Sequence, residues 1–165
     1  MALHHSYRLF APAYDFFIRR ASKSARTASL ARLPAGAGAR VLVVGIGTGL
    51  DAPHLPPGNT YVGIDLTAAM LARVPRGAGL ALVRGDAMRL PFADEAFDFV
   101  VLHLIVAVVP HPDRCLAEAE RVLKRGGRAL VLDKFLRPGE RAPLRRARAP
   151  GARNPPPETF HHRGR

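Results

Sequence analysis

Three glycines and one aspartate have the types and spacing of a site for a nucleoside-containing cofactor. Gly45, Gly47 and Gly49 directly follow the apolar run at residues 41–44, and Asp65 lies 20 residues after Gly45. Glycines at the end of a strand let the backbone adopt positive φ and approach a ligand closely. A carboxylate at the end of the next strand can accept hydrogen bonds from both hydroxyls of a ribose.

The residues around this turn favour a cofactor without phosphates. A dinucleotide fingerprint that starts at Gly45 requires glycine at position 50, where this chain has Leu50. The phosphate-binding pattern G-x-x-x-x-G-K-S/T is absent, and Pro53 interrupts the helix that would otherwise seat a pyrophosphate. An NAD-dependent oxidoreductase therefore stays as an alternative that Leu50 disfavours.

The elements that must position these residues alternate between strand and helix patterns. A helix beginning after Thr67 and running to Arg73 is expected, and another from Asp113 to about Lys124 that ends before Gly126 and Gly127. Apolar runs of strand length occur at residues 41–44, 60–64, 80–83, 97–104 and 128–132. This alternation predicts an α/β fold, a Rossmann-like and mainly parallel sheet with flanking helices. In such a sheet, ligands bind outside the carboxyl ends of the strands.

The chain divides by composition into three parts. Residues 1–33 mix aromatic and basic residues and are expected to form an N-terminal helical lid, and residues 34–136 form the α/β core. Residues 137–165 are rich in Arg and Pro and have no period of a strand or helix, so we expect an irregular tail. The net charge of +12 comes mostly from the two ends. A basic lid next to aromatic residues is also compatible with an anionic membrane surface.

Several stretches together resemble the class I S-adenosylmethionine-dependent methyltransferases. The resemblance covers about residues 40–134, with a further element from Tyr7 to Asp15, and the stretches that carry it are VLVVGIGTG, YVGIDLTAAML, GDAMRLPFADEAFDFVVL and AEAERVLKRGGRALVLD. The stretches LDKFLRPGE and YRLFAPAYDFF are most similar to enzymes that methylate bacterial phosphatidylethanolamine, next to those of ubiquinone and menaquinone synthesis. The resemblance implies S-adenosylmethionine as cofactor and methyl transfer to a small-molecule or lipid acceptor, with a phospholipid amine favoured.

The resemblance also implies a role for each residue of the site. The three glycines would lie against the methionine part of the cofactor, Asp65 would hold the ribose, and Leu66 would pack on the adenine. Asp86 would accept a hydrogen bond from the adenine amino group, with the Ala87 and Met88 backbone beside the ring. Four residues would border the substrate. Leu104 would also contact the cofactor, and the catalytic candidates are His103, Tyr7 and Tyr14. A histidine is a suitable base for an amine acceptor.

Two departures from the family leave a second reading open. Val43 stands where the family usually has the acid that binds the cofactor's ammonium group, and the last two strands of the family sheet are expected to be missing after the fifth. A non-catalytic remnant that serves as a binding domain is therefore the alternative.

The rest of the composition narrows the class of protein. Cys115 is the single cysteine, so neither an internal disulfide nor a cysteine zinc cluster is possible, and we expect no metal. With no signal peptide or membrane-length apolar run, we expect a cytoplasmic protein, peripheral to the membrane if the lid binds lipid. Specific nucleic-acid binding is not expected, and the sequence does not indicate an oligomeric state.

Overall fold

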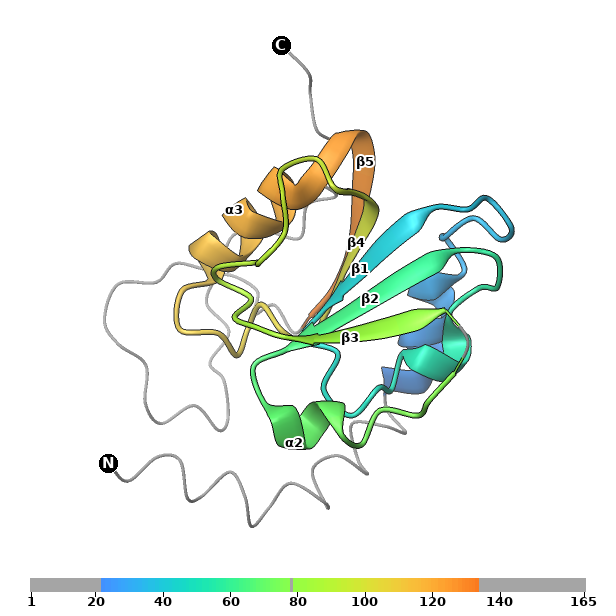
Figure 1. Ribbon diagram of the computed structural model, residues 1–165, viewed down its shortest axis with the longest axis horizontal. Helices are drawn as coiled ribbons and strands as arrows, with labels where there is room; N and C mark the ends of the chain where they lie inside the picture. Colours follow the sequence, from blue (N-terminus) through green and yellow to red (C-terminus); the bar gives the residue numbers. More distant parts are fainter. Residues whose placement is uncertain (1–21, 78, 134–165) are drawn as a thin grey trace, which may run out of the picture.

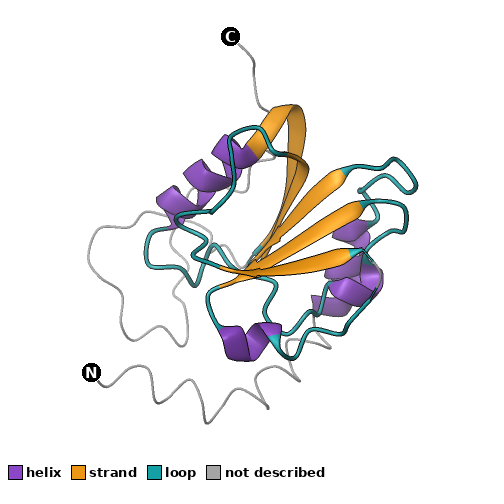
Figure 2. Ribbon diagram, in the orientation of Figure 1, coloured by secondary structure: helices purple, strands orange, loops and turns teal. Residues whose placement is uncertain are grey.

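The described residues form a parallel α/β sandwich (Figures 1 and 2). The computed structural model describes residues 22–77 and 79–133. Within them, a five-stranded sheet has the order β3-β2-β1-β4-β5, with every neighbouring pair parallel. Its strands are β1 (Arg40–Val44), β2 (Thr60–Asp65), β3 (Leu80–Arg84), β4 (Phe97–His103) and β5 (Leu123–Leu132). The predicted fold class is confirmed for these residues, whereas the division at residues 33 and 136 and the irregular tail involve residues outside the described part and stay predictions.

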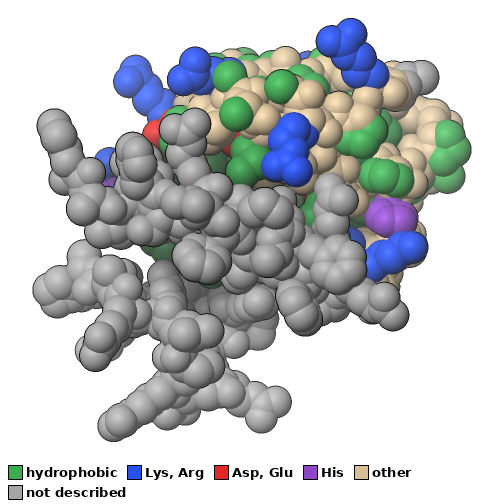
Figure 3. Space-filling view, turned by 90° about the horizontal axis from the view of Figure 1, so that it is seen from below, with side chains coloured by type: hydrophobic (Ala, Val, Ile, Leu, Met, Phe, Trp, Pro, Cys, Tyr) green, Lys and Arg blue, Asp and Glu red, His purple; other side chains and the backbone are tan. Residues whose placement is uncertain are grey.

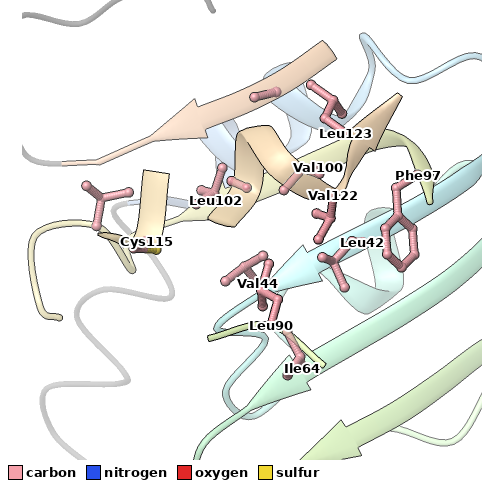
Figure 4. Close-up of a cluster of buried hydrophobic side chains, with 13 residues drawn as sticks. Leu42, Val44, Ile64, Leu90, Phe97, Val100, Leu102, Cys115, Val122 and Leu123 are labelled. Carbon is pink, nitrogen blue, oxygen red and sulfur yellow. The ribbon is translucent and has the colours of Figure 1, made fainter. Parts of the chain in front are cut away.

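The central strand β1 is buried on both faces, which explains its unbroken apolar sequence. Leu42 and Val44 contribute to a cluster covered by helix α3 (Pro112–Val122), whose core-facing residues include Cys115 and Val122 (Figure 4). Val41 and Val43 point the other way, into a cluster with Leu30, the last of the helical residues 22–30, and Leu33, which follows that helix. Successive strand side chains alternate between faces, so these two helices hold the sheet from opposite sides.

The connections differ from the sequence prediction in where helices begin and end. Helix α2 (Ala68–Leu71) covers a single turn instead of extending to Arg73, and the Thr67 side chain makes no capping hydrogen bond. A short 3-10 helix, η1 (Ala52–His54), follows the glycine turn, as expected from its prolines.

The boundary between α3 and β5 is also earlier than predicted. The helix ends at Val122, and Leu123 already pairs with Phe97 of β4. The pairing register then shifts between Phe97 and Phe99, so that residues 124–127 of β5 have no partner in β4. Gly126 has a positive φ in this stretch, and regular pairing resumes between Phe99 and Arg128. The N-cap position of α3 is His111, and Asp113 lies in the first turn, where its charge favours the helix dipole.

Candidate active site at the carboxyl edge of the sheet

The glycine turn closes over the end of the neighbouring strand. The backbone N–H groups of Gly45 and Ile46 both donate to the Ile64 carbonyl, at 2.9 and 3.0 Å. The Gly47 N–H donates to Asp65 Oδ2 at 2.9 Å. All three glycines have positive φ, at 67°, 56° and 81° for Gly45, Gly47 and Gly49. The turn is therefore fixed to the carboxyl ends of both β1 and β2.

The three glycines serve two different purposes. A Cβ atom at Gly45 would lie 2.7 Å from Ile105, and one at Gly49 would lie 2.8 Å from Val74, so both positions are required for packing. A Cβ at Gly47 would meet nothing nearer than the Gly45 carbonyl oxygen at 3.9 Å. Among the described residues, no atom therefore fills the side of the turn at Gly47, as a cradle for a ligand requires, and the residues present fit the methionine part of S-adenosylmethionine.

Each carboxylate oxygen of Asp65 accepts one hydrogen bond from a backbone N–H group. Oδ2 accepts from Gly47 and Oδ1 accepts from the Thr67 N–H, also at 2.9 Å. A carboxylate has about four lone-pair positions, so hydrogen bonds from two ribose hydroxyls remain possible. Leu66, the next residue, is 65% exposed, so its side chain is available to pack on a ring held by Asp65.

The segment after β3 forms a turn held by its own aspartate. Asp86 Oδ1 accepts from the Met88 N–H at 2.8 Å, and the Asp86 backbone carbonyl accepts from the Arg89 N–H at 3.1 Å. The Ala87 and Met88 side chains pack against the core cluster beneath α3. Their backbone therefore has a fixed position beside the end of β2, as the predicted adenine site requires.

The segment after β4 passes over the glycine turn. Leu104 has a positive φ of 59°, which is strained for a leucine, and its N–H donates to the Leu132 carbonyl at 2.7 Å. This conformation turns the chain back over the sheet so that Ile105 contacts Gly45. Leu104 is thus brought to the same edge as the glycines, Asp65 and Asp86.

His103, the last residue of β4, does not point freely toward this edge. The residue is 4% exposed, its Nδ1 lies 2.9 Å from Asp51 Oδ1, and its Nε2 lies 3.0 Å from Ser29 Oγ. Asp51 Oδ1 also accepts from the Arg26 guanidinium at 2.8 Å. We call these four residues, Arg26, Ser29, Asp51 and His103, the buried polar cluster.

The electrostatics of the cluster keep Asp51 ionised. Burial alone would raise the pKa of Asp51, but the hydrogen bond from His103, together with the hydrogen bond and charge of Arg26, lowers it below its ordinary value. A buried carboxylate without such partners would be costly, so the three groups stabilise one another.

The structure thus brings together most, but not all, of the predicted site residues. Gly45, Gly47, Gly49, Asp65, Leu66, Asp86, Ala87, Met88 and Leu104 follow the carboxyl ends of four adjacent strands. Tyr7 and Tyr14 lie outside the described residues. Val43, at the position where the resemblance implies an acid, is 1% exposed and packs in the apolar cluster with Leu30 and Leu33. The binding and catalytic roles of all these residues stay predictions.

Sequence reasoning missed Arg26, Ser29 and Asp51. Their signal was weak, because Arg26 and Ser29 lie in a short helical segment whose neighbouring core residue, Leu30, indicates only apolar packing. Asp51 sits at the N-cap position of η1 without a capping hydrogen bond, and only the fold shows that its side chain is used elsewhere.

A hollow of about 480 Å³ lies at the opposite, amino edge of the sheet and contains none of the site residues. It is lined by Arg32, Pro34, Asp98, Phe99 and residues 124–128. Arg and Lys side chains also reach the surface among hydrophobic ones on the face shown in Figure 3. The hollow is thus separate from the edge where the glycines and carboxylates converge.

Within the described ranges, no group of three or more His, Cys, Asp or Glu residues could hold a metal ion, and no helix has the length and apolarity needed to cross a bilayer.

Comparison with known proteins identifies the family. The family described as "Methyltransferase domain" matches residues 42–131. The phosphatidylethanolamine N-methyltransferase of Cereibacter sphaeroides is 39% identical over 150 residues, which are 87% of this chain and 72% of that protein. The demethylmenaquinone methyltransferase of Renibacterium salmoninarum is 39% identical over 103 residues, 61% of this chain, so the chain spans only 43% of that relative.

A solved structure agrees with these matches. The chain resembles an S-adenosylmethionine-dependent methyltransferase of Thermotoga maritima with a TM-score of 0.59 and 29% identity, over 76% of this chain and 58% of that one. Residues 42–131, which the family matches, include the glycine turn, Asp65 and the ends of β3 and β4. These elements form the carboxyl-edge site. The chain therefore belongs to the methyltransferase domain family, within the class I S-adenosylmethionine-dependent methyltransferases.

Proposed function

We propose that the chain transfers a methyl group from S-adenosylmethionine to a lipid-borne acceptor, with a phospholipid amine favoured over a quinol. The observation that carries the cofactor assignment is the open cradle at Gly47 beside an Asp65 that retains acceptor capacity. The acceptor assignment is supported by the greater extent of the match to the phosphatidylethanolamine enzyme, 87% of this chain against 61% for the demethylmenaquinone enzyme.

In this proposal, the protein binds and orients instead of supplying a nucleophile. The cofactor supplies a methyl group on a sulfonium sulfur, which an acceptor lone pair can attack in line. The glycine turn holds the methionine part, Asp65 the ribose, and Leu66 with the residue 86–88 turn the adenine. Such alignment and exclusion of water provide much of the acceleration of a reaction that disperses charge.

The substrate side of the proposal places the chain at a membrane surface. A phospholipid acceptor resides in a bilayer, and the net charge of +12 would attract the chain to anionic lipid. We therefore infer peripheral membrane association.

The test is methyl incorporation from radiolabelled S-adenosylmethionine into defined lipids. Vesicles of phosphatidylcholine would contain either phosphatidylethanolamine or a demethylated quinol, and labelled products would be separated by chromatography. We expect label in the phosphatidylethanolamine products only, and about ten- to hundredfold less label with Asp65→Ala when S-adenosylmethionine is well below saturation. Label in the quinol alone would contradict the favoured acceptor. Binding of S-adenosylhomocysteine without any transfer would favour the non-catalytic remnant.

A further inference from the structure

The buried polar cluster connects three distant parts of the chain at the edge where methyl transfer is proposed. Arg26 and Ser29 come from the helical residues 22–30, Asp51 follows the glycine turn, and His103 ends β4. The Asp51–His103 and His103–Ser29 contacts join residues 52 and 74 positions apart. An assembly of this kind next to the cofactor turn calls for a reason beyond packing, because buried ion pairs contribute little net stability.

The contacts define the hydrogen positions of the His103 ring. A carboxylate can only accept, so Nδ1 carries the hydrogen that is donated to Asp51 Oδ1. In the neutral ring, Nε2 is then a lone-pair acceptor, and the Ser29 hydroxyl donates to it. This order of carboxylate, imidazole and hydroxyl is the one in which a histidine takes a proton from a serine.

The exposure of the four residues shows which of them an acceptor molecule could reach. Arg26, Asp51 and His103 are buried, at 7%, 2% and 4%, whereas Ser29 is of intermediate exposure. Both ring nitrogens of His103 already have protein partners. His103 therefore cannot contact the acceptor without breaking a buried hydrogen bond, and Ser29 is the outer end of the chain of contacts.

The setting of Ser29 fits proton transfer better than covalent catalysis. A serine nucleophile requires backbone N–H groups that stabilise an oxyanion. Ser29 lies inside a helix, where the neighbouring N–H groups are used in helical hydrogen bonds. The same three groups without an oxyanion hole can still move a proton.

Resting on the proposed function, we propose that Ser29 is the residue that deprotonates the methyl acceptor, acting through His103 with Asp51 as the positioning residue. Ser29 Oγ takes the acceptor's N–H proton while its own hydrogen moves to His103 Nε2. The electron pair released on the acceptor nitrogen forms the new bond to the methyl carbon, and the pair of the broken carbon–sulfur bond stays on sulfur. The imidazolium that results lies against the Asp51 carboxylate and later returns its proton to solvent through Ser29.

The neighbours of His103 on the elements packed against it are charged on the helix side and apolar in the adjoining strand. From the helical residues 22–30 the facing cation is Arg26, which shares Asp51 Oδ1 with His103. Asp133 directly follows β5, and its Oδ2 accepts from the Ala107 N–H. The strand partner of His103 itself is the apolar Leu132.

The test compares variants that remove one hydroxyl or one ring nitrogen. Ser29→Ala removes the outer hydroxyl, Ser29→Thr keeps it, and His103→Asn keeps a donor toward Asp51 but loses Nε2. Ser24→Ala removes an exposed hydroxyl from the same helix and is the matched control. For each, single-turnover methyl transfer to phosphatidylethanolamine is measured from about pH 6 to 9, together with the affinity for S-adenosylhomocysteine.

We expect Ser29→Ala and His103→Asn to lower the transfer rate by about 100-fold or more at neutral pH, because a general base contributes that much. The double variant should lose no more than either single one, since the two act as a unit. Ser29→Thr should recover most of the rate, Ser24→Ala should match the wild type, and no variant should change the affinity for S-adenosylhomocysteine. The deficit of Ser29→Ala should shrink as the pH rises, because more of the amine then arrives without its proton.

Two results would overturn the relay. An unchanged rate in Ser29→Ala would exclude Ser29 as the base, and a parallel loss of S-adenosylhomocysteine affinity would make the cluster a structural tie. Absence of S-adenosylhomocysteine binding by the wild-type chain would instead contradict the proposed function. In that case ¹⁵N resonances of the His103 ring, assigned with His103→Asn, still decide the cluster: a neutral Nδ1–H ring supports its wiring, and an Nε2–H ring overturns it.

Discussion

The glycines of the turn differ in what an added side chain would meet, which makes the turn a residue-scale test of ligand contact. Gly47→Ala adds a methyl group on the open side, whereas Gly45→Ala drives one to within 2.7 Å of Ile105. Gly36 has a similar φ of 69° and nothing within 4 Å, so Gly36→Ala reports backbone strain alone. Strain of this kind costs about 1–3 kcal/mol.

We expect Gly47→Ala to match Gly36→Ala in unfolding free energy but to bind S-adenosylhomocysteine at least about tenfold more weakly. Gly45→Ala should be less stable than both, because Ile105 must move. Urea unfolding and calorimetry measure the two quantities. Wild-type affinity in Gly47→Ala would mean that the ligand does not lie on this turn.

Asp51 gives a second residue-scale prediction, on pH dependence. Because the folded state lowers the pKa of Asp51, the unfolded state binds more protons in acid, and the stabilisation is present above about pH 4. It is lost as the pH falls through the lowered value. Breaking a buried pair costs about 3–5 kcal/mol, so Asp51→Asn should lose that much at neutral pH.

The difference between wild type and Asp51→Asn should shrink below about pH 4. Urea unfolding at several pH values measures it. The difference between the two proteins isolates Asp51, because hydrogen bonds from Lys124 and Arg121 also lower the pKa values of Asp98 and Glu118. A gap that stays constant down to about pH 2 would contradict the account.

At the scale of elements, helix α3 holds the single cysteine under the sheet. Burial, together with the nearby charges of Asp86 and Asp133, raises the pKa of Cys115 to about 11. The thiolate is the reactive form, so a disulfide reagent at about pH 8 should label native Cys115 at least about 100-fold more slowly than the unfolded chain. Absorbance of the released thiol measures both rates. Rates within a few-fold of each other would show that α3 opens readily.

The strands and the turn could be predicted from sequence because their signals are local. The run at residues 41–44 is apolar on both faces, and the glycines and Asp65 keep a spacing that depends on one strand–turn–strand unit. The end of α3 could not, because Leu123 continues the helical apolar pattern and its partner Phe97 lies in another strand. The buried polar cluster was also hidden, since Ser29, Asp51 and His103 meet only through the fold.

For the whole molecule, the sheet separates two edges of different character. The carboxyl edge carries the open glycine, the carboxylates and the exposed Leu66, whereas the amino edge carries the hollow lined by Arg32 and residues 124–128. One sheet order and one direction of all strands are enough to bring residues 45, 65, 86 and 104 together. The site is thus a property of the topology, to which the helical residues 22–30 add the polar cluster from one side.

The most direct test of the account is calorimetric titration of the full chain with S-adenosylhomocysteine, beside Asp65→Ala and with NAD as the competing ligand. We expect one site for S-adenosylhomocysteine, none for NAD, and an affinity lowered about ten- to hundredfold in Asp65→Ala. The factor follows from the loss of hydrogen bonds to a charged group, about 1.5–3 kcal/mol. Equal affinity in wild type and Asp65→Ala, or binding of NAD instead, would contradict the assignment of the carboxyl edge as the cofactor site.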